Sequence, residues 1–184
     1  MNDIIILLPI AAFIALAAGL AVVLRGTGRI VARTREVDQF RAGVKGLAAR
    51  IDVSLGTAAS EIDALRRRQV DPEAIATTVT STKDAVEVYL EEARALKCPG
   101  EARQIQSSIV TDLERAQRAL GMVEHGTTIM ATARRGPREL EAQTSVKRGY
   151  LNLIHAREAM ARHALDAQEF ATEDQTGQAG RRVT

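Results

Sequence analysis

Apolar residues recur every three or four positions through most of the chain, which is the period of an amphipathic α-helix. The first series occupies positions 37, 40, 44, 47, 51, 55, 58, 62 and 65. Its spacing is close to a heptad repeat with one slip near Leu55, as in a coiled coil. The pattern predicts a long helix from about residue 35 to residue 69.

The segment "VDPE" (70–73) supplies a new helix start, with Asp71 as N-cap and Pro72 in the first turn. The helical period then continues from Ile75 to Leu96 and predicts a second helix. It includes "TTVTST" (77–82), which favours a strand by propensity but lies within the helical register.

A third apolar series runs from Ile105 to Val123, and the sequence leaves open whether its helix continues past Gly126, because an interior glycine costs about 1 kcal/mol relative to alanine. Gly136 is expected to end this segment and Pro137 to begin a fourth helix, which runs to about Phe170. Turns this short place neighbouring helices antiparallel. We therefore predict an all-α fold in which residues 37–171 form an up-down-up-down four-helix bundle, followed by a disordered polar tail at 172–184.

The N-terminal segment Ile4–Leu24 contains 21 residues without a charge, and as a helix it would be about 31 Å long, enough to span a bilayer. A cleaved signal peptide would instead have a basic start and a shorter apolar run. We therefore predict a short translocated tail at 1–3, a single-pass transmembrane helix at 4–24 and a basic juxtamembrane joint at 25–36.

Four arginines follow this segment and none precedes it: Arg25, Arg29, Arg33 and Arg35. By the positive-inside rule, the bundle is expected on the cytoplasmic side of the cell membrane. The lipid bilayer is thus one expected partner. Self-association through the anchor or the bundle, giving a homo-oligomer, is a second expectation.

Charge and cysteine content exclude some other classes of protein. The net charge is +2, but residues 1–35 carry +3 and the remainder −1. A nearly neutral body is not typical of a nucleic-acid-binding protein, which needs a basic face, so no specific nucleic acid is expected. Cys98 is the only cysteine, so neither an internal disulfide nor a cysteine-based zinc site can form.

The densest cluster of functional side chains is "KRGYLNLIHAREAMARH" (147–163), but it contains no catalytic signature. His155 and His163 lie about 80° apart around a helix and about 12 Å apart along it, so they cannot bind one metal ion. Both are expected on the solvated face of the fourth helix. We predict no catalytic residue, no metal ligand and no cofactor.

The predicted topology brings several arginines to the end of the bundle distal to the membrane. This group serves as a candidate docking tip for an acidic partner, and it comprises Arg66, Arg67, Arg68, Arg134, Arg135 and Arg138. The alternative is that these cations only stabilise helix C-termini, where each contributes about 0.3–1 kcal/mol.

Arg157 projects from the apolar arc of the fourth helix, where a buried guanidinium needs an acidic partner. The antiparallel register places Asp112 of the third helix nearby. The sequence therefore predicts a buried Arg157–Asp112 pair, the alternative being that Arg157 extends its charged end into solvent.

A single N-terminal span followed by a bundle of long helices resembles the LemA-type architecture. "RIDVSL" (50–55) is similar to a segment in the first long helix of that family, whereas "GTAASEIDALRR" (56–67) departs from its pattern. The resemblance implies a layout and no function.

These observations predict a non-catalytic, membrane-anchored helical bundle that acts as a scaffold or protein-interaction module with an unidentified protein partner. One alternative is an extracytoplasmic ligand-sensing bundle. Such a sensor normally needs a second transmembrane span to carry its signal inward, and the sequence contains no second apolar run of 18 residues. Another is an anchored protein that docks anions or nucleic acid through the arginine tip.

Overall fold

The computed structural model describes residues 3–132 and 136–180, and the side chains of 3–15, 17–30 and 171–180 are not part of that description. Within these residues the chain contains four α-helices and no strand: α1 (Asp3–Arg66), α2 (Ala76–Ala95), α3 (Arg103–Thr132) and α4 (Pro137–Gly180). Two short 3₁₀ helices, Pro72–Ile75 and Gly100–Ala102, precede α2 and α3. The predicted all-helical bundle is confirmed.

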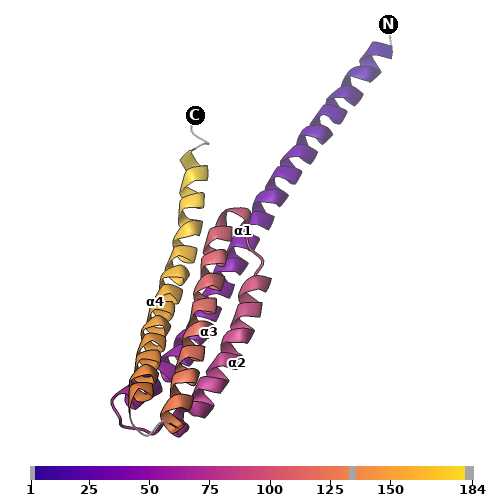
Figure 1. Cartoon of the computed structure of the whole chain (residues 1–184). Helices are drawn as coiled ribbons and strands as arrows, with labels where there is room; N and C mark the ends of the chain where they lie inside the picture. Colours follow the sequence, from indigo (N-terminus) through magenta and orange to yellow (C-terminus); the bar gives the residue numbers. More distant parts are fainter. Residues whose placement is uncertain (1–2, 133–135, 181–184) are drawn as a thin grey trace.

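The helices alternate in direction, so that the α1–α2 and α3–α4 connections lie at one end of the bundle (Figure 1). α4 packs against α1 and α3, and α2 packs against the same two helices. All nine apolar positions of the first predicted series are buried in α1, from Val37 to Leu65. The β-prone segment 77–82 is helical, and Thr82 within it is buried.

α3 and α4 approach each other closely because two glycines lie in their contact. α3 continues through Gly126 to Thr132, which answers the question that the sequence left open. A Cβ atom on Gly126 would lie 2.7 Å from Cγ2 of Val146, and one on Gly149 would lie 2.7 Å from the carbonyl oxygen of Ala119. Because glycine has no side chain, Gly126 and Gly149 allow the backbones of α3 and α4 to approach this closely.

α1 is one continuous helix of 64 residues, and its N-terminal part projects well beyond the bundle (Figure 1). The predicted joint at 25–36 is therefore part of this helix and does not interrupt it. Gly26 and Gly28 each cost about 1 kcal/mol in a helix, but extending a helix that already exists avoids the larger cost of nucleation. The first turns of the bundle are also held by an ion pair of 2.7 Å between Arg33 and Glu101.

The prediction of a disordered tail at 172–184 is wrong as far as residue 180, because α4 continues without interruption to Gly180. Polar residues can extend an existing helix at little cost, since nucleation has already occurred. Residues 181–184 and residues 1–2 lie outside the described part of the chain.

The predicted transmembrane segment Ile4–Leu24 has helical backbone from Ile4 onward, but its side chains, except that of Leu16, lie outside the described residues. In the described part of the chain, no helix is both long enough and apolar enough to cross a membrane.

Candidate anion-binding site at the tip of the bundle

The end of the bundle that carries the α1–α2 and α3–α4 connections is called the tip, and it comprises residues 63–75, 128–132 and 136–150. An ion pair of 3.6 Å between Arg68 and Glu139 joins the end of α1 to the start of α4. The structure thus brings Arg68 to the first turn of α4, where Arg138 is exposed. Arg66 and Arg67 precede Arg68 at the end of α1. The other two arginines of the predicted tip, Arg134 and Arg135, lie outside the described residues.

α1 ends in a Schellman motif, in which the last carbonyl groups accept hydrogen bonds from the residues that follow the helix. The amide of Arg68 donates to the carbonyl of Leu65 at 2.9 Å, and the amide of Gln69 donates to that of Ala64 at 2.9 Å. The motif requires a left-handed residue at its turn, a position usually occupied by glycine. Here Arg68 adopts that conformation, with φ of 59°.

Arg68→Gly is expected to raise the free energy of unfolding by roughly 0.5–1 kcal/mol, because glycine avoids the left-handed strain while only an exposed ion pair is lost. Arg67→Gly is the control. Its amide continues the helical pattern by donating to Asp63, so that substitution should destabilise the protein by a similar amount. Chemical denaturation followed by circular dichroism measures both, and a destabilised Arg68→Gly variant would contradict this account.

The other arginines at the end of α1 are oriented by their own helix and by α4. Arg66 and Arg67 both form ion pairs with Asp63, at 3.0 Å and 2.7 Å. The Arg66 guanidinium also lies over the ring of Tyr150, 4.4 Å from its centroid. These contacts partly neutralise the two cations and fix the direction of Arg66.

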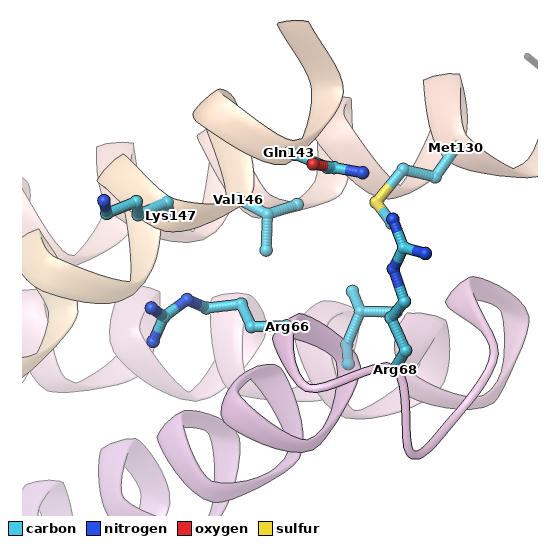
Figure 2. Close-up of a pocket in the computed structure, with 7 residues that line it drawn as sticks. Arg66, Arg68, Met130, Gln143, Val146 and Lys147 are labelled. Carbon is cyan, nitrogen blue, oxygen red and sulfur yellow. The ribbon is translucent and has the colours of Figure 1, made fainter. Parts of the chain in front are cut away.

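A cavity of about 200 Å³ opens between the end of α1 and the facing residues of α3 and α4. Figure 2 shows Arg66 and Lys147 on one side of Val146, with Arg68, Gln143 and the Met130 sulfur on the other. The cavity therefore combines cationic groups with an apolar surface. Its lining residues are Leu65, Arg66, Arg68, Met130, Gln143, Val146 and Lys147.

The predicted pair between Arg157 and Asp112 is wrong. Nε of Arg157 donates to Oδ1 of Asp52 on α1 at 2.6 Å, and this hydrogen bond raises the pKa of Arg157. Arg157 does meet a carboxylate, but it turns toward α1 rather than α3. The pair is also not buried, because 40% of the Arg157 side chain and 56% of the Asp52 side chain are exposed. The Arg157 guanidinium also lies against Gly56, where a Cβ would be in ordinary van der Waals contact with its carbon at 3.4 Å.

Asp112 is instead the buried centre of a different polar cluster. Its side chain is 12% exposed and accepts from Arg115 at 2.6 Å, and it lies 2.9 Å from Nε2 of His163. The prediction that His163 is solvated is therefore wrong, because its side chain is only 16% exposed. His155 is exposed, as predicted. In the described chain no three His, Cys, Asp or Glu side chains are grouped to hold a metal ion.

Of the four predicted membrane-flanking arginines, Arg33 pairs with Glu101 in the α2–α3 connection, and Arg35 is exposed. The side chains of Arg25 and Arg29 lie outside the described residues.

Four residues of the tip were not assigned to it from the sequence: Met130, Gln143, Lys147 and Tyr150. The predicted register already placed the start of the fourth helix beside the end of the first. Lys147 and Gln143 lie four residues apart, so they share one face of that helix, which was the available signal.

Comparison with known protein families, with curated proteins and with solved structures finds no match. The resemblance in layout to LemA-type proteins is therefore not supported by any family match.

Proposed function

We propose that this protein is a membrane-anchored, non-catalytic interaction module whose bundle presents its tip to an acidic partner. The observation that carries the proposal is the continuity of α1, a single helix from the apolar segment at its start to the arginines at its end. At about 1.5 Å per residue, α1 advances about 63 Å from Leu24 to Arg66. A stiff connection of this kind holds the tip at a set distance from an anchor.

The charges of the tip favour an acidic partner over simple capping of helix ends. Arg138 lies in the first turn of α4, where the helix dipole disfavours a cation, so it cannot be explained as a C-terminal cap. Lys147 lies more than two turns inside α4 and likewise caps no helix end. Neither residue forms an ion pair within the described chain. Two cations that pair with no described residue at one end of the bundle favour recognition of an external anion.

The test is cross-linking of the full-length protein in its native membrane, followed by recovery of cross-linked partners. Replacing Arg66, Arg67, Arg68 and Arg138 with glutamine is expected to abolish partner recovery. The control replaces four exposed arginines outside the tip: Arg94, Arg103, Arg118 and Arg162. Equal recovery from both variants would contradict docking at the tip.

Cys98, in the connection between α2 and α3, can report membrane topology once its reactivity in the folded protein is known. The thiol is partly buried, and burial raises its pKa, so less thiolate is present at neutral pH than in an exposed cysteine. We expect a thiol reagent to label the folded protein more slowly than the protein unfolded in urea. The difference between the two labelling rates should decrease as pH rises, because the folded thiol then also ionises. Equal rates at neutral pH would show that Cys98 is not protected.

If the bundle is cytoplasmic, a membrane-impermeant reagent should label Cys98 only after the cells are permeabilised. Because the thiol reacts slowly, the labelling buffer must be alkaline. Labelling of the unfolded protein serves as the standard for complete reaction. Labelling in intact cells would overturn the cytoplasmic assignment and favour the extracytoplasmic ligand-sensing alternative.

A further inference from the structure

The size of the tip cavity restricts what can occupy it. At about 200 Å³ it is smaller than the roughly 300–1,000 Å³ of pockets that hold drug-sized ligands. One amino-acid side chain with its terminal group, or a small organic acid, is of the right order. A folded surface could not enter it, although an extended chain end could.

The lining of the cavity restricts the chemistry of its ligand. Leu65 and Val146 are both buried core residues with 2% exposure, and they form an apolar wall together with Met130. Inorganic phosphate would leave this wall in contact with a strongly hydrated ion, which is unfavourable. A purely apolar ligand would leave the surrounding cations unused. The combination favours a short apolar chain that ends in an anionic group.

The cations of the cavity differ in how far they are already neutralised. Lys147 forms no ion pair with a described residue. Arg68 contacts Glu139 at 3.6 Å, a long distance for such a pair, and Glu139 also accepts a hydrogen bond from Gln143 at 3.0 Å. Arg66 is held between Asp63 and the Tyr150 ring. A carboxylate can therefore gain Lys147 as a first partner without breaking an existing contact.

The backbone at Arg68 gives an independent reason to assign this arginine a role in binding. Arg68 adopts the left-handed region, which is strained for a non-glycine residue, and glycine would form the same turn without that strain. Its internal ion pair is largely exposed, with 78% of the Arg68 side chain accessible, so that pair offsets little of the strain. Residues held in such conformations cluster at ligand-binding sites.

We infer that the tip cavity binds the carboxylate of a short, branched apolar chain, as the free C-terminus of a partner polypeptide presents it. The apolar side chain lies against Leu65, Val146 and Met130. Lys147 and the flanking arginines bind the carboxylate. This inference deepens the proposed function and rests on docking at the tip.

The test is isothermal titration calorimetry on the full-length protein in detergent micelles. The first probe is an N-acetylated hexapeptide that ends in leucine with a free carboxylate. The second is the same peptide with a C-terminal amide, and the third and fourth are 4-methylpentanoate and inorganic phosphate. We expect the free-carboxylate peptide to bind at least tenfold more tightly than the amide and phosphate, because hydrogen bonds to charged groups discriminate by at least that factor.

The free acid distinguishes the source of the ligand. If 4-methylpentanoate binds as tightly as the peptide, the cavity recognises a small organic acid, and if the peptide binds more tightly, it recognises a chain end. Equal binding of peptide acid and amide would overturn the inference, as would equal binding of phosphate or no binding of either carboxylate.

Three variants test whether the peptide binds in this cavity. Lys147→Gln should weaken binding of the free-carboxylate peptide about tenfold. Lys97→Gln, an exposed lysine in the α2–α3 connection, should leave it unchanged. Arg68→Gly should weaken binding while the fold is retained, which separates ligand contact from structural support. Equal affinities of the Lys147 and Lys97 variants would contradict the assignment.

The outcome also separates this inference from the proposed function. Loss of the cross-linked partner in the four-arginine tip variant, together with no binding of any carboxylate, would refute the inference and leave the tip as the docking surface. Carboxylate binding without any effect of the tip variant on partner recovery would show a ligand site that does not serve partner docking.

Discussion

Gly149→Ala should destabilise the bundle by roughly 1–3 kcal/mol, the usual range for inserting a methyl group into a packed core. The new Cβ would lie 2.7 Å from both the carbonyl oxygen of Ala119 and Cγ2 of Val123. Val123 could change rotamer, but a backbone oxygen cannot move unless α3 shifts as a whole. Alanine favours the helix by about 1 kcal/mol over glycine, so the net loss is smaller than the steric cost.

Gly121→Ala is the matched control within the same helix pair. A Cβ at this position of α3 would meet nothing within 4 Å, so only the gain in helix propensity remains. We expect stabilisation of about 0.5–1 kcal/mol. Urea denaturation of the full-length protein in micelles, followed by circular dichroism, measures both variants. A stabilised Gly149→Ala variant would show that the helices do not approach as closely as the structure indicates.

The sequence predicted the core of α1 correctly because a period of three or four directly encodes a buried face. The burial of each apolar position from Val37 to Leu65 follows from its place on its own helix, and the identity of the neighbouring helices is not needed to predict it. The same local reasoning did not extend the helices into residues 25–36 and 172–180, where the sequence predicted a joint and a disordered tail. Both segments extend helices that the bundle already nucleates, which lowers the cost of each added residue.

The polar contacts were predicted less well because they depend on which neighbouring helix a side chain faces. The register between the third and fourth helices was nearly right, since Gly149 lies against Ala119. Arg157 nevertheless reaches Asp52 in α1, and Asp112 is bound by His163. A helical wheel gives the buried arc but does not divide it between two packing partners. The tip cavity was missed for the same reason, because three helices contribute to it.

Asp112→Ala should reduce the free energy of unfolding by about 1–3 kcal/mol, the cost of leaving a largely buried hydrogen-bonding group, the His163 ring, without its partner. His163 and Arg115 both bond to this carboxylate, at 2.9 Å and 2.6 Å. Only 16% of the His163 side chain is exposed, so the ring cannot freely replace the lost hydrogen bond with one to water. Its other ring nitrogen lies 3.7 Å from Asp166, too far for a hydrogen bond that could compensate.

A double-mutant cycle with His163→Ala determines how much of this loss belongs to the contact between α3 and α4. If the two residues act as one unit, the double variant should be less destabilised than the sum of the single variants, by about 0.5–3 kcal/mol. Asp166→Ala, whose side chain is 57% exposed, should change the free energy of unfolding by no more than about 0.5 kcal/mol. Additive effects of Asp112→Ala and His163→Ala would contradict the cluster, and would leave Arg115, on the same helix as Asp112, as its only energetically significant partner.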